Sequence, residues 1–327
     1  MKALFISGTG LISSAVSKLA VERGIELCLL NRGQKSEFFP KGARQIKADN
    51  GDAKAVTEAL RGESFDVVVD WIAFTPDQAA RDIELFSGRT GQFIFISSAS
   101  AYQKPPTRYL ITESTPLANP FWQYSRDKIA CERLLRDQDK LAYTIVRPAH
   151  TVRTYMPIEV GDADNAIRRM IAGKPVIVTG DGSSLWTLTR SVDVARAFVR
   201  LLGAPQAIFD DFHITTDRGF TWNQIHDAIA RGFGVAAIHA HVPTDVLVAY
   251  EPEWEGQLMG DKTWCALYDN SKVKGVVGEF HASQDIDEIL ADSVMHAKQR
   301  LNAPAPPPSA EDQLIDRIIA AQASVRP

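Results

Sequence analysis

The sequence predicts an α/β protein built on a doubly wound parallel sheet, with a smaller mixed α/β lobe after it. Apolar runs without polar alternation suit strands that are buried on both faces, and patterns of helical periodicity separate these runs. The first run, residues 3–6, is followed by an apolar helical face between residues 11 and 20. The later runs of strand type lie at 26–30, 65–69, 92–96 and 143–146, and helical stretches lie at 53–60, 78–85 and 127–135.

After about residue 150 this alternation loosens into mixed segments that contain Gly, Pro and Trp. Thr221 is placed to cap a helix that begins near Trp222. Residues 303–309, Ala-Pro-Ala-Pro-Pro-Pro-Ser, cannot continue a helix and predict a stiff linker. A short helix follows and must dock on the rest of the protein, because short helices are marginal alone. Its apolar face consists of Leu314, Ile315, Ile318 and Ile319.

Composition excludes several classes of protein. The 327 residues carry 36 Lys and Arg against 40 Asp and Glu, a net charge of −4, so a nucleic-acid partner is disfavoured. Cys28, Cys131 and Cys265 are far apart, so neither a disulfide framework nor a metal site is expected. No apolar run approaches the roughly 18 residues of a membrane span, and the first residues do not resemble a signal peptide. We expect a soluble, cytoplasmic protein without a membrane partner.

A glycine-containing turn follows the first predicted strand and opens the first predicted helix. A helix N-terminus offers free N–H groups and a dipole that favour an anion, and glycine lets the backbone approach a pyrophosphate closely. A turn of purely geometric origin is the alternative. We predict that this turn binds a dinucleotide through Ser7, Gly8, Thr9, Gly10, Leu11 and Ile12.

The end of the second strand bears on the choice of dinucleotide. A carboxylate there normally takes the ribose 2′-hydroxyl of NAD, but this chain has Asn31 and Arg32. Arginine suits a 2′-phosphate, which favours NADP, while a neutral Asn31 still permits NAD. Asp49, after the third strand, is a candidate acceptor for the adenine amino group, and a plain turn residue is the alternative.

The catalytic signal begins at the serine-rich end of the strand at 92–96 and continues downstream in Tyr124-Ser125-Arg126-Asp127-Lys128. Tyr124 and Lys128 are four residues apart and share one helix face. Placed beside a nicotinamide, a lysine ammonium lowers the pKa of a phenol, so the phenol can exchange a proton with a substrate oxygen that a serine hydroxyl also holds. Ser98, Tyr124 and Lys128 are the predicted catalytic residues.

In this order, the glycine turn, the serine-rich strand end and Tyr-x-x-x-Lys resemble the extended short-chain dehydrogenase/reductase family, of the NAD-dependent epimerase/dehydratase type. The resemblance covers about residues 1–300. The family's turn usually reads Gly-Gly-Thr-Gly-Phe-Ile-Gly, and two of its three signature glycines are serines here, Ser7 and Ser13. The resemblance implies a Rossmann domain, with Ser98 and Tyr124 in catalysis and Lys128 also on the nicotinamide ribose.

The same resemblance implies further site residues and a domain plan. His150 falls where the family often places a substrate contact. Nucleotide-sugar members usually carry an arginine near the position of Trp186, where it clamps the diphosphate, but here an aromatic residue occupies that place. An indole cannot neutralise phosphates, so a nucleotide-sugar substrate is disfavoured unless Arg153 or Arg190 supplies the missing positive charge. Ser100 is a further substrate candidate, and the cofactor wall is expected to include Trp71, Ile72, Ala73 and Pro148. The plan is a Rossmann domain at 1–150 with returns near 186–216 and 262–275, a substrate lobe mainly at 151–302, and a linker and C-terminal helix at 303–327.

Three functions remain. The first is an NAD(P)-dependent oxidoreductase that transfers hydride at a secondary alcohol or carbonyl of a small polar, sugar-like substrate. The second is a sugar or nucleotide-sugar epimerase with retained NAD, which uses the same three catalytic residues. The third is a non-catalytic nucleotide- or RNA-binding relative, against which an intact Tyr124 and Lys128 argue. The resemblance also implies a homodimer.

Overall fold

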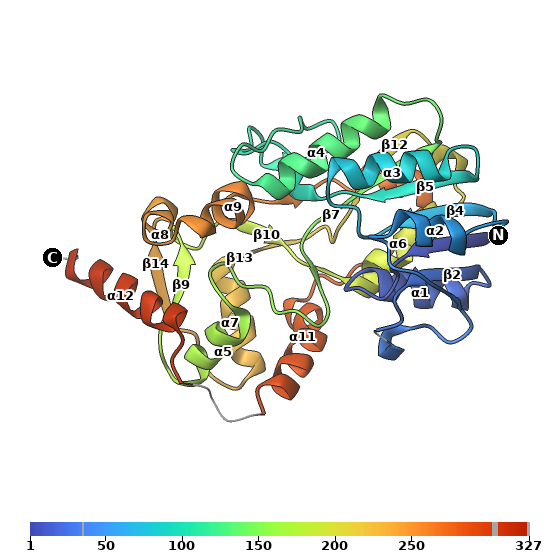
Figure 1. The fold of residues 1–327 in the computed structure, drawn as a ribbon. Helices are drawn as coiled ribbons and strands as arrows, with labels where there is room; N and C mark the ends of the chain where they lie inside the picture. The colour runs from blue at the N-terminus through green and yellow to red at the C-terminus, as the bar shows by residue number, and fades with distance from the viewer. Residues whose placement is uncertain (35, 303–306, 326–327) are drawn as a thin grey trace.

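The computed structural model describes residues 1–34, 36–302 and 307–325. Its centre is a parallel sheet of seven strands in the order β12-β7-β5-β4-β1-β2-β3, which confirms the predicted fold class (Figure 1). All five apolar runs lie within strands of this sheet. The strands are β1 (Lys2–Ile6), β2 (Glu26–Asn31), β3 (Arg44–Lys47), β4 (Phe65–Asp70), β5 (Thr90–Ile96), β7 (Tyr143–Pro148) and β12 (Asp210–Ile214).

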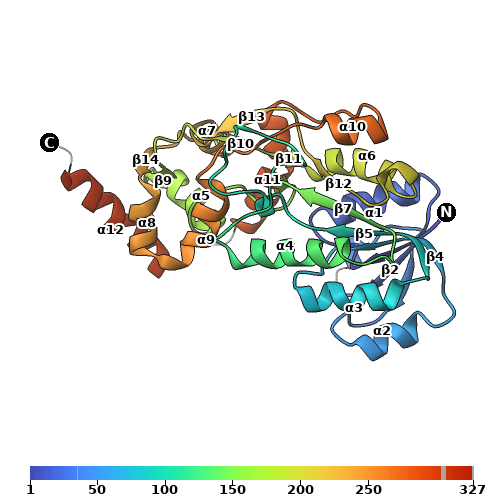
Figure 2. The same cartoon turned by 90° about the horizontal axis from the view of Figure 1, so that it is seen from above.

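Two helical layers cover the sheet, which explains why its strands lack polar alternation. In β1, Ala3 and Phe5 pack into the core on one face, while Leu4 and Ile6 pack into the core on the other. The first face is covered by α1 (Ser13–Glu22), α6 (Ser191–Leu201) and α10 (Ser271–Val277). The second is covered by α2 (Ala53–Ala59), α3 (Pro76–Phe86) and α4 (Gln123–Arg136) (Figure 2).

The strand order reverses direction at β1, whose neighbours are β2 and β4. In an open parallel sheet this reversal leaves a crevice beyond the carboxyl ends of the strands, where ligands bind. The segments that follow β1, β4, β5 and β7 meet at this edge of the sheet, which brings the turn at 7–13, residues 71–74, residues 97–100 and residues 149–151 around one cavity.

The second lobe contains short paired strands and helices and lies beside the parallel sheet (Figures 1 and 2). The helices of this lobe are α5 (Ala163–Ile171), α7 (Trp222–Gly232), α8 (Thr244–Tyr250), α9 (Glu255–Gln257) and α11 (Ile286–Arg300). Thr221 caps α7 as predicted, because its hydroxyl accepts from Gln224 N at 3.1 Å and the Gln224 side chain accepts from Thr221 N at 3.0 Å. The strand pairs are β9 (Val176–Thr179) with β14 (His239–Val242), β10 (Leu185–Thr187) with β13 (Gly219–Thr221), β8 (Thr151–Val152) with β11 (Thr189–Arg190), and β6 (Leu110–Ile111) with β15 (Leu267–Tyr268).

The C-terminal helix α12 (Ala310–Val325) docks on the second lobe. Ile315 and Ile318 are buried there among side chains of the β9–β14 pair. Asp312 forms an ion pair with buried Arg169 and another with Lys174 at 3.1 Å. Residues 303–306 of the predicted linker lie outside the described residues. Across the part of the chain that is described, none of the helices combines the length and the apolar character needed to cross a membrane.

Candidate active site

The turn after β1 has the conformation that a glycine-rich loop requires. Gly8 has φ of +84°, and a Cβ atom there would lie 2.5 Å from Leu29 Cδ2, so a larger residue does not fit. Ser7 also has positive φ, 81°, which is unusual for a residue with a side chain. The serine thus keeps the backbone geometry of the glycine that the family usually has at this position. At the other substituted position, Ser13 Oγ accepts from Gly10 N at 2.7 Å and closes the turn.

A cavity of about 350 Å³ lies beside this turn, at the ends of β2 and β3. Asn31 shapes it, because its side-chain oxygen accepts from Gly33 N at 2.9 Å and from Gln45 Nε2 at 2.8 Å. Arg32 and Asp49 face each other at 3.9 Å with about 60% of each side chain exposed. The predicted cofactor residues at this end, Thr9, Asn31, Arg32 and Asp49, all line the cavity.

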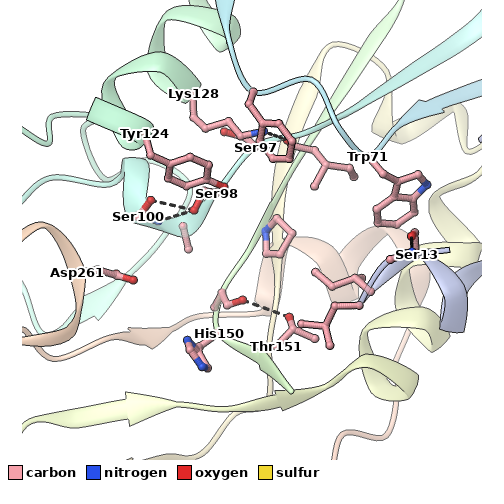
Figure 3. A pocket seen from close by; sticks show the side chains of 18 of the residues that line it. Ser13, Trp71, Ser97, Ser98, Ser100, Tyr124, Lys128, His150, Thr151 and Asp261 are labelled. Carbon is pink, nitrogen blue, oxygen red and sulfur yellow. Dashed lines mark hydrogen bonds between the residues drawn. The ribbon is translucent and has the colours of Figure 1, made fainter. Parts of the chain in front are cut away.

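A larger cavity of about 470 Å³ adjoins the first and shares Ser7, Gly10 and Ile72 with it (Figure 3). Together the two cavities follow the carboxyl ends of the strands and offer the extended cleft that a dinucleotide needs. Gly8 and Ala73 line neither cavity. The other residues predicted from the sequence do line the larger one, namely Leu11, Ile12, Trp71, Ser98, Ser100, Tyr124, Lys128, Pro148, His150 and Trp186.

A chain of serine hydroxyl groups leads to Ser98. Ser125 Oγ, on α4, donates to Ser100 Oγ at 2.8 Å, and Ser100 Oγ lies 2.9 Å from Ser98 Oγ. Ser98 Oγ also accepts from Ser100 N at 3.2 Å, as the cap of a short 3₁₀ turn at Ala99–Ala101. Either hydroxyl of the Ser98–Ser100 pair can be the donor, so the Ser98 proton can be directed to Ser100 Oγ or into the cavity.

Lys128 is buried under the cavity and holds the ends of two loops. Its ammonium donates to the carbonyls of Ala73 and Ile96, each at 2.7 Å. This gives Ala73 a structural contact with Lys128 instead of a place on the cavity wall. Burial lowers the pKa of Lys128 to about 8.

Tyr124 differs in one respect from the expectation that lysine lowers the pKa of the phenol. Burial raises the pKa of Tyr124, and a hydrogen bond with Ser98 only partly opposes this shift. Lys128 Nζ lies 5.8 Å from the centre of the Tyr124 ring and donates two hydrogen bonds to backbone carbonyls. In the protein alone, the phenol therefore keeps its proton at neutral pH.

Helix α4 is fixed from behind by a buried ion-pair network. Arg147, on β7, bonds Glu132 of α4 at 2.6 and 2.9 Å and Asp211 of β12 at 2.6 Å. Asn119 Nδ2 donates to the carbonyls of Ser100 and Gly260, each at 2.7 Å, and thereby ties the serine turn to the second lobe. These contacts set the orientation from which Tyr124 and Lys128 enter the cavity.

The second lobe contributes Asp261, which sequence reasoning missed. It belongs to a turn of π-helix, Leu258–Lys262, and its carboxylate is directed toward the cavity from the side opposite the dinucleotide turn (Figure 3). A π-helical turn is a frequent feature of functional sites, but no sequence pattern here announces one. The neighbouring Trp122 also lines the cavity, directly before the helix that carries Tyr124.

Comparison with known proteins identifies the family. The model of the NAD dependent epimerase/dehydratase family matches residues 4–214. The chain belongs to this family and thus to the extended short-chain dehydrogenases/reductases, which are NAD(P)-dependent enzymes, as the resemblance implied.

Two curated relatives match most of the chain. One is the 2'-dehydrokanamycin reductase of Streptomyces kanamyceticus, 22% identical over 272 residues, which are 81% of this chain and 74% of that protein. The other is the chloroplast stem-loop binding protein of 41 kDa b of Arabidopsis thaliana, 25% identical over 266 residues, which are 77% of this chain and 66% of that protein.

Solved structures share the fold at low sequence identity. A short-chain dehydrogenase/reductase superfamily protein of Agrobacterium tumefaciens with bound NAD has a TM-score of 0.71 and 18% identity, covering 92% of this chain and 98% of that one. UDP-glucose 4-epimerase of Thermotoga maritima with UDP-glucose has a TM-score of 0.71 and 19% identity, covering 92% of this chain and all of that one.

Proposed function

We propose that the protein is an oxidoreductase that transfers hydride between a nicotinamide dinucleotide and a secondary alcohol or carbonyl of a small polar substrate. The observation that carries this proposal is that Ser98, Tyr124 and Lys128 line one cavity, which adjoins the cleft along the strand ends. A relative that matches most of the chain is a reductase by its name, 2'-dehydrokanamycin reductase.

The roles of the three residues follow from their surroundings. When bound, the nicotinamide supplies or accepts the hydride. In reduction, the Tyr124 hydroxyl gives its proton to the substrate oxygen, for which its raised pKa keeps it in the protonated form at neutral pH. Ser98 donates a hydrogen bond to the same oxygen. Lys128 holds the loops after β4 and β5 through the two carbonyls that it bonds, and it offers its remaining donor capacity toward the ribose.

We propose NADP as the preferred dinucleotide. Arg32 is the exposed cation at the end of β2, and the neutral Asn31 replaces the carboxylate that would repel a 2′-phosphate. NAD is the alternative, because Asn31 and Asp49 both line the same cavity and can bond a ribose or an adenine.

Epimerisation is the second candidate, because the family model that matches the chain includes epimerases. It uses the same three residues but retains its cofactor between the two hydride transfers. A cofactor that co-purifies in stoichiometric amount supports the epimerase, whereas a dinucleotide that exchanges freely supports the reductase. RNA binding without catalysis has less support, because the Ser98–Tyr124–Lys128 set is intact and the net charge is −4.

The experiment begins with calorimetric binding of NADPH, NADP, NADH and NAD, and continues with Tyr124→Phe. We expect the variant to bind the dinucleotide as the wild type does and to lose at least about 100-fold in turnover, the usual size of a general-acid contribution. Tyr109→Phe is the control, because Tyr109 is 75% exposed and lines neither cavity. Near wild-type turnover of Tyr124→Phe refutes the assignment.

A further inference from the structure

Two buried carboxyl groups lie behind the wall of the larger cavity. Asp70 ends β4 and is fully buried, and Asp82 is buried on α3, the helix that covers this face of the sheet. The carboxyl group of Asp82 forms a hydrogen bond with the carboxyl group of Asp70. Because a carboxylate oxygen can only accept, this bond requires that one of the two groups carries a proton.

The surrounding donors satisfy only one oxygen of each carboxyl group. Asp70 Oδ1 accepts from Ile72 N at 2.5 Å and from Ala73 N at 2.8 Å. Asp82 Oδ1 accepts from Arg81 Nη2 at 3.2 Å. The second oxygens, Asp70 Oδ2 and Asp82 Oδ2, are buried and accept from no N–H or hydroxyl group of the described residues. Buried acceptors without a donor are rare in native proteins, and a proton held between the two groups supplies the donor that the surroundings lack.

The charges around the pair favour one shared proton over two ionised carboxylates. Burial and the adjacent Asp70 raise the pKa of Asp82 well above its usual value, and Arg81 on the same helix only partly opposes this shift. Lys128, on α4, is a second cation that the charge of Asp70 acts on, where it opposes the lowering of the lysine pKa by burial. Two carboxylates in contact in a buried site do not both ionise, so the pair keeps one negative charge.

The pair supports the segment 71–74, which follows β4 and lines the larger cavity. Asp70 caps this segment through the two backbone N–H groups that it accepts from. Within the same segment, the carbonyl of Ala73 accepts from Lys128 Nζ at 2.7 Å. A shift of Asp70 is therefore transmitted both to the cavity wall and to an acceptor of the Lys128 ammonium.

Helix α3 also connects the pair to the smaller cavity, at the ends of β2 and β3. Arg81 Nη1 donates to the carbonyl of Asn50, a residue that lines this cavity. Gln78, one turn earlier on the helix, lines the same cavity and accepts from Phe74 N at 2.7 Å and from Thr75 N at 3.1 Å. The helix thus contacts the walls of both cavities, and the bond between the two carboxyl groups joins it to the end of β4.

We propose that Asp70 and Asp82 share one proton between their carboxyl groups, and that this hydrogen bond positions the wall of the dinucleotide cleft and, through Ala73, the ammonium of Lys128. Both are positioning residues, because neither lines the larger or the smaller cavity. Without the proton, two like charges would repel each other at the point where α3 meets the end of β4. The proposal rests on the proposed oxidoreductase function, since it gives the pair a role in binding the dinucleotide.

The first test is infrared difference spectroscopy of the wild type and Asp82→Asn at pH 7. A protonated carboxyl group has a carbonyl stretch that an ionised carboxylate lacks, and asparagine donates a hydrogen bond to Asp70 without a proton to share. We expect the wild type to show this band and the variant to lose it. Labelling of aspartate with carbon-13 should shift the band, which separates it from protonated glutamates such as Glu159.

Calorimetric titration with NADPH and NADH then tests the positioning role. Asp82→Asn keeps a donor toward Asp70 and should bind the dinucleotide as the wild type does, whereas Asp82→Ala removes the bond and should weaken binding at least about tenfold. Asp77→Ala is the matched control, an exposed acid of the same helix that lines neither cavity, and it should leave the affinity unchanged. If Asp82 acted only as an ionised partner of Arg81, asparagine would replace it no better than alanine does.

Three outcomes overturn the proposal: no aspartate band that Asp82→Asn removes, an affinity loss in Asp82→Asn as large as in Asp82→Ala, or an unchanged affinity in Asp82→Ala. If Asp82→Ala does not fold, the infrared band and the affinity of Asp82→Asn relative to the wild type still decide. A wild type that binds dinucleotide and depends on Tyr124, but gives one of these outcomes, keeps the oxidoreductase function and loses only the role of the pair. A wild type that binds no dinucleotide refutes the function and the positioning role, while the infrared band still decides whether the proton is shared.

Discussion

Arg32→Ala tests the dinucleotide preference directly. Arg32 stands at the end of β2, where the second ribose of a bound dinucleotide is expected, and its guanidinium lies 3.9 Å from the Asp49 carboxylate. Truncation removes the cation and leaves the backbone of the turn in place, because Asn31, not Arg32, holds Gly33 and Gln45. The substitution should therefore act on the 2′-phosphate and not on the fold.

The size of the effect follows from exposure. A hydrogen bond to a charged group contributes about 1.5–3 kcal/mol when it is well formed. Arg32 is about 60% exposed and shares its charge with Asp49, so solvent screening places the contribution at or below the lower end of that range. About 1.4 kcal/mol corresponds to about a tenfold loss of affinity for NADPH. NADH lacks the phosphate, so its affinity should stay the same.

The assay is isothermal calorimetry of NADPH and NADH binding to the wild type and to Arg32→Ala, at low and at moderate salt. Arg23→Ala is the control, because Arg23 is an exposed arginine at the end of α1 that lines neither cavity. Equal losses for both dinucleotides, or no loss for either, would refute the reasoning and leave NAD as the cofactor. A loss confined to NADPH that shrinks with salt supports it.

Three further predictions concern stability. Burial raises the pKa of Glu159 to about 8 from its usual 4.5, so the folded protein holds a proton that the unfolded chain releases between these pH values, and stability falls as the pH rises. Glu159→Gln removes this pH dependence. In urea unfolding, the free energy of unfolding of the variant relative to the wild type should rise by about 4 kcal/mol from pH 5 to pH 8, and a difference that stays constant with pH contradicts the raised pKa. Asp312→Asn should cost about 1–3 kcal/mol, because buried Arg169 keeps Asp316 as a partner, and a cost near zero in urea would mean that α12 is not held by this pair. Gly8→Ala should lower the melting temperature and abolish dinucleotide binding in calorimetry, because its methyl group would collide with Leu29, and wild-type binding would contradict this.

The sequence was enough to predict the sheet, because burial on both faces leaves a direct mark on composition. In β1 successive residues enter opposite cores, so every position must be apolar, and the run 3–6 shows it. The cavity of the candidate site was also predictable in part, since Ser98, Tyr124 and Lys128 come from segments whose order along the chain places them at the same edge of the sheet.

What the sequence did not reveal are contacts between distant segments. Asp261 reaches the cavity from a π-helical turn more than 130 residues beyond Tyr124, and its partner Lys104 is an unremarkable lysine of the first domain until folding buries it. The contacts of Lys128 are a second example, because a spacing of four residues places Tyr124 and Lys128 on one helix face but does not reveal that Lys128 donates to the carbonyls of Ala73 and Ile96.

The chain departs from the family's usual residues at the dinucleotide turn, where it has Ser7, and at the diphosphate clamp, where it has Trp186, and the two substitutions have different consequences. Ser7 keeps the positive φ of a glycine, so substitution at the cofactor end is absorbed by a backbone that still forms the cleft. Trp186 lines the larger cavity in place of a cation, and none of the described residues that line this cavity is an arginine. The first substitution thus keeps the cleft for a dinucleotide, while the second removes the cation that would clamp a diphosphate, and this is the physical basis for expecting a family reaction on a substrate that lacks a nucleotide.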